Sequence, residues 1–284
     1  MRASTTIFAI TALLASTAQA QIPGLSSGLI SGLSTNCLGG LASLLSNQDL
    51  NSCLAITSVI TELGTVGQND SLVGPLNTYI GSNLCPASPC SNSTLASANS
   101  TINQSCSSEI QSGANVLPGL LQLVVSNYND VKKASCYEDT KANNEICIVQ
   151  TLTNLQQNLG QNVSLNTITS LSKGGSSALQ PLLSKLAANS SALCTDCNRG
   201  ILTTLAPTLQ SYLNSSTNQA LQQAVAQGCG QTFLTSGVPT DLKETGKLQT
   251  TSGSNSGTNG ASLVTVSSVT AGTALLAIGM ALLA

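Results

Sequence analysis

The one recognisable reactive motif of this chain is Cys194-Thr195-Asp196-Cys197, a C-x-x-C pair. Such a pair acts as a redox centre when a helix N-terminus lowers the pKa of one thiol, and a helical apolar pattern starts soon afterwards at Ile201. Redox pairs of the thioredoxin type lie in a βαβ unit, however, and no strand pattern surrounds this motif. We therefore expect both cysteines to form structural disulfides, with redox catalysis as the alternative.

A second candidate for chemistry is the group of charged residues in and near the segment between Cys136 and Cys147. Its members are Glu138, Asp139, Glu145, Lys132, Lys133 and Lys141. Paired carboxylates serve as acid and base in glycoside hydrolysis. Outside the N-terminal segment 1–20, few aromatic side chains are present to bind a sugar, namely Tyr79, Tyr128, Tyr137, Tyr212 and Phe233. We therefore expect a solvated loop held at both ends by disulfides, with a carboxylate-dependent enzyme as the alternative.

Composition excludes several other kinds of site. The chain has no His and no Trp, and only 7% of its residues are charged. Without His, the usual Ser-His-Asp or Cys-His catalysis and the mixed Cys/His zinc sites cannot be built. Basic residues are fewer than acidic ones, so we expect no phosphate-binding surface for nucleic acid. The sequence therefore predicts no catalytic residue, no metal ligand, no cofactor and no nucleic-acid partner.

Ten cysteines indicate a disulfide framework, because an even number in a secreted chain favours disulfides over metal thiolates. They fall into two sets of five in similar order: Cys37, Cys53, Cys85, Cys90 and Cys106, then Cys136, Cys147, Cys194, Cys197 and Cys229. This order suggests a duplication with halves at 37–112 and 132–235, although Leu- and Ser-rich helical sequences also align with themselves by chance. Each half has five cysteines, and bonds within a half use an even number of them. If all ten cysteines pair, the number of bonds between the halves must therefore be odd.

Apolar residues recur at helical spacing along most of the chain, which predicts amphipathic helices. The stripes are Leu38–Leu45, Ile56–Leu63, Leu120–Tyr128, Ile148–Leu159 and Leu202–Leu213, with Gly or Pro between them. We therefore predict an all-α, disulfide-stapled helical ectodomain over 21–235. From 236 to 259 the sequence is rich in Gly, Ser, Thr and Lys and has no apolar period, so we expect a disordered stalk there.

Both ends of the chain carry targeting patterns. Arg2, the apolar run Ile7–Leu14 and Ala18-Gln19-Ala20 predict a signal peptide over 1–20, since the run is too short for a membrane helix. The apolar tail Leu263–Ala284 follows a run of small polar residues and carries no basic residue, which favours a GPI-anchor signal over a retained membrane helix. We expect attachment at Asn259, with Asn255 as the alternative, and removal of residues 260–284.

Seven Asn-x-Ser/Thr sequons offer sites for N-glycosylation in the secretory pathway: Asn69, Asn92, Asn99, Asn103, Asn162, Asn189 and Asn214. A chain rich in Ser, Thr and Asn also makes sequons by chance. Because few charged residues are present to keep the surface soluble, we expect glycans on most of these sites.

The cysteine motifs resemble those of fungal secreted, GPI-anchored cysteine-rich proteins that carry a domain of unknown function. The matching residues follow the pattern C-x-x-C and then C-G-x-x-F…P, and they are Cys194, Cys197, Asn198 and Ile201, then Cys229-Gly230, Phe233 and Pro239. The segment from Cys37 through Asp49 to Cys53-Leu54 is similar to the start of that domain, so the resemblance covers Cys37 to Leu242. It implies a helical disulfide domain at the cell surface and brings no assigned activity.

These features predict a non-enzymatic, GPI-anchored glycoprotein, tethered to the outer face of the plasma membrane or passed on to the glucan of a cell wall. The first alternative is an extracellular module that binds a small apolar ligand such as a sterol or fatty acid, because an aliphatic helical core can enclose one. The second alternative is an enzyme based on the C-x-x-C pair or on the carboxylates.

Overall fold

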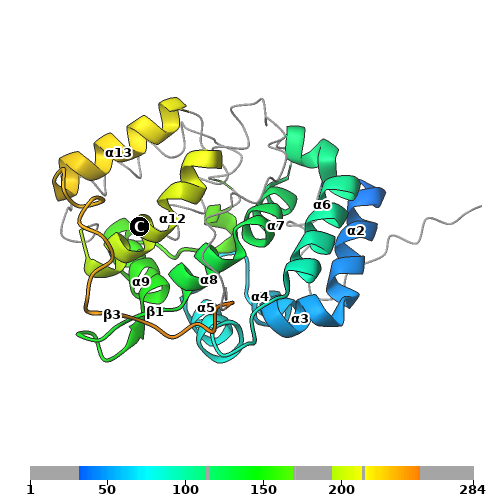
Figure 1. Cartoon of the computed structure of the whole chain (residues 1–284), viewed down its shortest axis with the longest axis horizontal. Coiled ribbons are helices and arrows are strands. Elements are labelled where there is room, and N and C mark those ends of the chain that lie inside the picture. The colour runs from blue at the N-terminus through cyan, green and yellow to red at the C-terminus, as the bar shows by residue number, and fades with distance from the viewer. Residues whose placement is uncertain (1–31, 113–114, 169, 171–193, 213–214, 250–284) are drawn as a thin grey trace, which may run out of the picture.

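The computed structural model describes residues 32–112, 115–168, 170, 194–212 and 215–249. Of these residues, 67% are helical and 4% lie in strands, which confirms the predicted all-α class. The helices are α2 (Thr35–Ser46), α3 (Gln48–Leu54), α4 (Ile56–Gly64), α5 (Val73–Thr78), the π-helix η1 (Tyr79–Leu84), α6 (Asn92–Ser112), α7 (Val116–Ser126), α8 (Tyr128–Ser135), α9 (Cys147–Leu159), α12 (Asp196–Tyr212) and α13 (Ser215–Cys229) (Figure 1). The strands are β1 (Tyr137–Asp139), β2 (Glu145–Ile146) and β3 (Leu242–Glu244). The predicted signal peptide and anchor signal lie outside the described residues.

Polar residues and glycine set the limits of several helices. Ser34 caps α2, where its Oγ accepts a hydrogen bond from the Cys37 N–H over 3.2 Å. Asn47 caps α3 in the same way, accepting from the Leu50 N–H over 2.9 Å. At the end of α9, Gly160 has a φ of 66°, a left-handed conformation that favours glycine and stops the helix.

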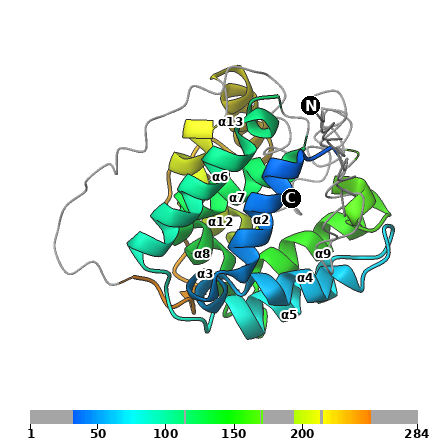
Figure 2. The same cartoon turned by 90° about the vertical axis from the view of Figure 1, so that its right-hand side faces the viewer.

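Most of the predicted apolar stripes lie in single helices, namely α2, α4, α9 and the described part of α12. The stripe from Leu120 to Tyr128 is divided, because α7 ends at Ser126 and α8 begins at Tyr128. The apolar pattern does not predict α6, because most of its 21 residues are Ser, Asn or Thr. Its buried residues Ala98, Ile102 and Cys106 are four positions apart and form a narrow apolar face that packs on α2 and α7 (Figure 2).

The buried side chains form two hydrophobic clusters. The N-terminal core consists of Cys37, Leu41, Leu44, Leu50, Cys53, Leu54, Leu84, Cys90, Ala98, Ile102, Cys106, Ile110, Val125 and Tyr128. The C-terminal core consists of Ile80, Cys85, Ala134, Cys136, Tyr137, Ile146, Cys147, Ile148, Val149, Leu152, Leu155, Leu159, Val163, Cys197, Ile201, Leu202, Leu205, Leu209, Val225 and Phe233. The first cluster belongs almost entirely to the first five-cysteine half and the second to the other half.

The two cores meet in a region that we call the seam, formed by η1, α8 and the Cys85–Cys136 disulfide. In η1, Leu84 belongs to the N-terminal core and Ile80 to the C-terminal core. In α8, Tyr128 belongs to the N-terminal core and Ala134 to the C-terminal core. No linker therefore separates the two halves in the described part of the chain.

Five disulfides join Cys37–Cys106, Cys53–Cys90, Cys85–Cys136, Cys147–Cys197 and Cys194–Cys229, and no cysteine is free. The predicted disulfide framework is confirmed, and its odd-number requirement is met by the single bond between the halves, Cys85–Cys136. In each half the second cysteine pairs with the fourth. The fifth cysteine pairs with the first in one half and with the third in the other, so the duplication stays a prediction.

Two predictions about irregular segments are wrong. The predicted loop between Cys136 and Cys147 is a hairpin, in which Asp139 pairs with Glu145. The predicted stalk begins too early, because β3 joins β1 in an antiparallel sheet of order β2-β1-β3. Strands of two or three residues are too short to show an alternating pattern, and the partner of β3 lies far away in the sequence.

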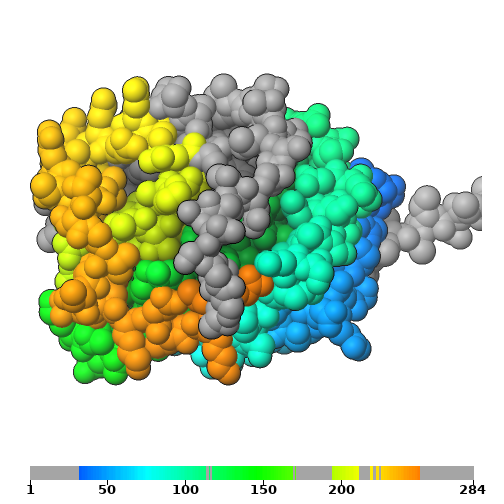
Figure 3. All heavy atoms as spheres, viewed as in Figure 1, coloured from blue at the N-terminus to red at the C-terminus, as the bar shows by residue number. Residues whose placement is uncertain are grey.

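Residues 239–249, which we call the C-terminal strap, run from the C-terminal core to the seam. Pro239 is buried, and Leu242 packs so closely on α12 that a Cβ added at Gly200 would overlap it. Further along, the Thr245 N–H donates a hydrogen bond to the Cys136 carbonyl over 3.0 Å. Figure 3 shows the strap in orange, lying across the lower part of the molecule. The strap is therefore part of the folded body.

Candidate functional site

The structure separates the two cysteines of the C-x-x-C motif. Cys194 is bonded to Cys229, and Cys197 is bonded to Cys147. A dithiol redox centre needs a bond between its own two sulfurs, and each of these sulfurs is bonded to a distant partner instead. The motif is a structural staple that fixes the start of α12 to α9 and to the end of α13.

The residues that carry the family resemblance come together around α12. Asn198 accepts a hydrogen bond from the Thr151 hydroxyl over 2.6 Å, and both side chains are completely buried. Ile201 and Phe233 belong to the C-terminal core, and Pro239 is buried where the strap begins. A buried amide without a partner costs about 1–3 kcal/mol, so the bond to Thr151 explains why Asn198 is tolerated inside the protein. These motif residues pack the C-terminal half.

The three carboxylates of the predicted charged loop do not converge on one point. Glu138 and Asp139 are neighbours in β1, so their side chains leave opposite faces of the sheet. Asp139 lies directly opposite Glu145 of β2. The Asp139 carboxylate accepts hydrogen bonds from the Lys141 N–H over 2.9 Å and from the Gln150 amide over 3.4 Å. Asp139 therefore stabilises the hairpin that contains it.

Ion pairs connect this hairpin to the strap and to α12. The Lys141 amine lies 2.5 Å from the Asp241 carboxylate and 3.6 Å from that of Asp196. Arg199 contacts the other oxygen of Asp196 over 2.8 Å. The hydrogen bond and the charge of Asp241 raise the pKa of Lys141. The described residues contain no group of three or more His, Cys, Asp or Glu side chains that could hold a metal ion.

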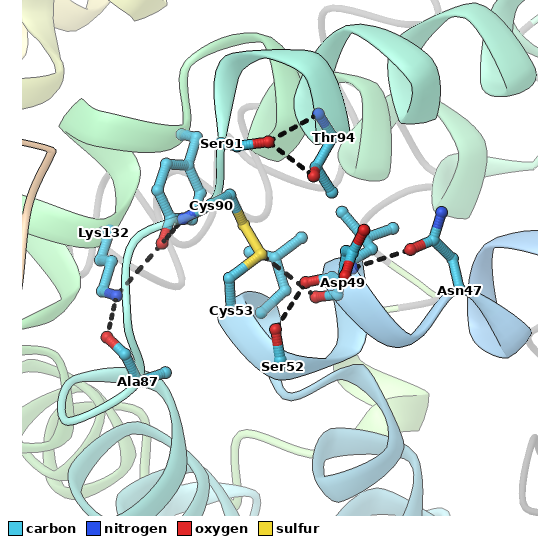
Figure 4. The surroundings of a disulfide bond; sticks show 12 residues. Asn47, Asp49, Ser52, Cys53, Ala87, Cys90, Ser91, Thr94 and Lys132 are labelled. Carbon is cyan, nitrogen blue, oxygen red and sulfur yellow. Dashed lines mark hydrogen bonds between the residues drawn. A yellow bond between two sulfur atoms is a disulfide. The ribbon is translucent and has the colours of Figure 1, made fainter.

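Lys132 is the exception in the predicted charge cluster, because it is buried. Only 1% of its surface is exposed, and its Nζ donates hydrogen bonds to the Ala87 carbonyl over 2.8 Å and to the Tyr128 hydroxyl over 3.1 Å (Figure 4). The same hydroxyl accepts a hydrogen bond from the Cys90 N–H over 3.2 Å. Burial, together with the nearby charge of Lys247, lowers the pKa of Lys132 to about 8. A buried amine with a lowered pKa therefore lies at the seam.

One feature of the sequence indicates that Lys132 is buried, namely its spacing from Tyr128. The two residues are four positions apart in α8, so they lie on the same face of the helix. That face points into the seam, because Tyr128 belongs to the N-terminal core. Residue type alone gives no sign of this burial, since buried lysines are rare.

Three of the predicted glycosylation sites are exposed, namely Asn69, Asn92 and Asn162. Asn92 begins α6. Asn69 and Asn162 lie in adjacent loops, and the Asn162 amide donates a hydrogen bond to the Asn69 carbonyl over 3.2 Å. A glycosylated amide keeps one N–H, so this hydrogen bond is compatible with a glycan on Asn162.

Two other predicted sites, Asn99 and Asn103, are in the interior of α6 and are half-buried against α7. The Asn103 carbonyl oxygen accepts a hydrogen bond from the Gln122 amide over 2.6 Å, and its Nδ2 donates to Asn99 over 3.2 Å. Asn99 also accepts a hydrogen bond from the Ser126 hydroxyl over 3.3 Å. A glycan on Asn103 would separate α6 from α7. The predicted sites Asn189 and Asn214 lie outside the described residues, as do Asn255 and Asn259.

We predict that the folded, secreted protein carries glycans on Asn69, Asn92 and Asn162 and none on Asn103, with Asn99 occupied at a low level. The reason is that molecules glycosylated at Asn103 cannot form the contact between α6 and α7. Glycopeptide mass spectrometry after deglycosylation in heavy-oxygen water measures the occupancy of each site. A Ser105→Ala variant removes the Asn103 sequon and should leave the glycoprotein mass unchanged, whereas Thr94→Ala removes the Asn92 sequon and should reduce it by one glycan. Full occupancy of Asn103 in folded protein would contradict the α6–α7 contact.

The chain matches no protein-family model, no curated protein and no solved structure. The resemblance to fungal GPI-anchored cysteine-rich proteins therefore stays a prediction. Among the helices described, none has the length and apolar character needed to cross a membrane.

Proposed function

We propose that this protein is a non-enzymatic, GPI-anchored glycoprotein of the cell surface or cell wall. The observation that carries the proposal is the pairing of all ten cysteines in five disulfides. Disulfides form and persist in oxidising compartments such as the secretory pathway and the cell exterior. The exposed sequons Asn69, Asn92 and Asn162 support the same location, because a secreted chain is glycosylated at such sites.

The sequence beyond the folded body supports the anchor. The strap is packed up to Gln249, so residues 250–259 are what remains of the predicted stalk between the body and the proposed attachment site at Asn259. The small polar residues before the apolar tail Leu263–Ala284 fit an anchor-attachment signal. We therefore propose a body held close to the membrane by a short connection, or transferred to wall glucan through the same anchor.

The anchor proposal predicts that phosphatidylinositol-specific phospholipase releases the protein from intact membranes. The reason is that a GPI-linked chain is attached only through its lipid, whereas a transmembrane helix resists the enzyme. Release is measured by immunoblotting of the supernatant after treatment. As a control, a variant that ends at Asn259 should be secreted without any treatment. Mass spectrometry of the C-terminal peptide then distinguishes attachment at Asn259 from attachment at Asn255.

A peptide containing Ala271–Ala284 in the mature protein would contradict the anchor proposal. The apolar-ligand module remains the alternative proposal, and it requires stoichiometric lipid in the purified ectodomain, which mass spectrometry of extracted lipids detects. No contact among the described residues specifically favours that alternative, since the aliphatic side chains of the two cores pack against one another. The redox-enzyme alternative requires a bond between Cys194 and Cys197, which have other partners.

A further inference from the structure

The C-terminal strap binds the seam through three cysteine carbonyls. The N–H and the hydroxyl of Thr245 both donate to the Cys136 carbonyl, over 3.0 Å and 2.9 Å. The Lys247 N–H donates to the Cys85 carbonyl over 3.3 Å. The side-chain amide of Gln249 donates to the Cys90 carbonyl. The strap therefore contacts residues of both cores, since Cys85 and Cys136 belong to the C-terminal core and Cys90 to the N-terminal core.

The buried amine of Lys132 lies in the same region. A Cβ added at Gly246 would be 3.0 Å from the Cys136 Cβ, 3.1 Å from its sulfur and 3.7 Å from the Lys132 carbonyl, so the strap passes directly against α8. The Tyr128 hydroxyl that binds Lys132 also binds the Cys90 N–H, and Gln249 of the strap binds the carbonyl of the same cysteine. The strap thus contacts Cys90, whose N–H shares the Tyr128 hydroxyl with the amine. Figure 4 shows Lys132 beside Ala87 and Cys90.

The strap is held by contacts of the kind that open easily. Pro239 at its start is buried, but its other apolar side chains Leu242 and Leu248 are only half-buried. The ion pairs Lys141–Asp241 and Lys133–Glu244 are partly exposed. Exposed hydrogen bonds and little apolar burial mark the segments of a protein that open locally. The cores beneath the strap are cross-linked by five disulfides and do not depend on it for their covalent connection.

We propose that the strap is a releasable clasp, which opens as a unit while the disulfide-linked cores stay folded, and whose opening exposes the amine of Lys132. The opening itself does not depend on the anchor. Its trigger rests on the proposed function, because in an anchored protein the chain continues from Gln249 toward the membrane. A pull on the anchor then acts first on the clasp.

Native-state hydrogen exchange combined with amine labelling of the glycosylated ectodomain tests the proposal. Labelling uses the N-hydroxysuccinimide ester of acetate at pH 8.5, with a short lysine-containing peptide added to the sample as the reference, because Lys133 and Lys141 form ion pairs with the strap. We expect the opening that exposes the Thr245 and Lys247 amides to be at least tenfold more frequent than the opening that exposes the core amides of Ile102 and Leu152. Hydrogen exchange of the strap amides should be faster by the same factor. Acetylation of Lys132 should show the same dependence on low urea concentrations as exchange of the strap amides.

A matched pair of variants sharpens the test. Gly246→Leu places a side chain against the Cys136 sulfur and should raise the rate of Lys132 acetylation at least tenfold relative to the reference peptide. Gly39→Leu adds the same side chain at an exposed position of α2 and should leave the ratio unchanged. If Gly246→Leu is not secreted, Asp241→Asn removes the ion pair to Lys141 without a change in size and should raise the ratio severalfold.

Two results would overturn the clasp. The first is exchange of the strap amides only through global unfolding, at the same rate as Ile102 and Leu152. The second is free exchange of the strap amides while Lys132 stays unlabelled, which would show that the strap does not cover the amine. Both results are independent of release by phospholipase, so a failure of the clasp and a failure of the anchor proposal can be told apart.

Discussion

Replacing Cys85 and Cys136 together by alanine is expected to lower the midpoint of thermal unfolding of the whole ectodomain by roughly 8–16 °C. The bond closes a loop with a sequence separation of 51. By the loop-entropy relation its loss costs about 4 kcal/mol, and each kcal/mol shifts the midpoint of a domain of this size by about 2–4 °C. Because this is the one disulfide between the two halves, we expect the loss to appear in both cores. Differential scanning calorimetry measures the midpoint, and hydrogen exchange at Ile102 and Leu152 reports on each core.

The control is the double variant of Cys194 and Cys229, a bond that lies within the C-terminal half. Its removal should increase exchange at Leu152 more than at Ile102. Removal of the Cys85–Cys136 bond should increase exchange at both amides by similar factors. If one core keeps its original protection when this bond is absent, the seam does not couple the two cores.

Alanine at Gly40 is expected to destabilise the protein by about 1–3 kcal/mol, whereas alanine at Gly39 should stabilise it by about 0.5–1 kcal/mol. Both glycines lie inside α2, where alanine is the better helix former. Gly40 is buried against α6, and a Cβ added there would overlap the Cβ and hydroxyl of Ser105. The Ser105 Cβ cannot rotate away, so the two helices would have to separate beside the Cys37–Cys106 disulfide. Gly39 is exposed, with no atom within 4 Å of an added Cβ.

Urea unfolding of the two variants measures the difference through the midpoint, provided that the slope of the transition is unchanged. A Gly40→Ala/Ser105→Gly double variant provides the control, since it removes the overlapping atoms and should recover part of the lost stability. Equal stability of the two single variants would contradict the close packing of α2 on α6.

Local patterns predict much of this fold because they act over short distances in the sequence. The stripe from Ile148 to Leu159 is α9, and Gly160 stops it where a left-handed conformation is needed. Parity predicts an odd number of disulfides between the halves without knowledge of any pairing, and the structure has one. The disulfide pairings themselves depend on which helices pack together, and the spacing of cysteines along the sequence does not determine that packing.

The predictions that are wrong concern residues whose surroundings come from distant parts of the chain. Leu242 is an isolated apolar residue in a polar segment, and only its contact with α12 and the pairing with β1 make that segment a strand. Lysine is usually a surface residue, and Lys132 is buried only because α8 lies where the two cores meet. The prediction that both cysteines of the C-x-x-C motif form structural disulfides is confirmed, but their partners Cys147 and Cys229 come from distant parts of the chain and could not be predicted from spacing.

The order of the disulfides also decides how the oxidised domain would carry a mechanical load. Two covalent routes of equal length lead from Cys229 to Cys37, and both pass through Cys194–Cys229, Cys147–Cys197 and Cys85–Cys136. They share the stretches 194–197 and 136–147. From Cys85, one route follows 85–90, the Cys53–Cys90 bond and 37–53, and the other follows 85–106 and the Cys37–Cys106 bond. A stretching force between the two ends is therefore transmitted through sulfur bridges, the β1–β2 hairpin, and then α2 and α3 in parallel with α6. The remaining helices lie in longer closed loops, so they cannot add their contour length while the bridges are intact.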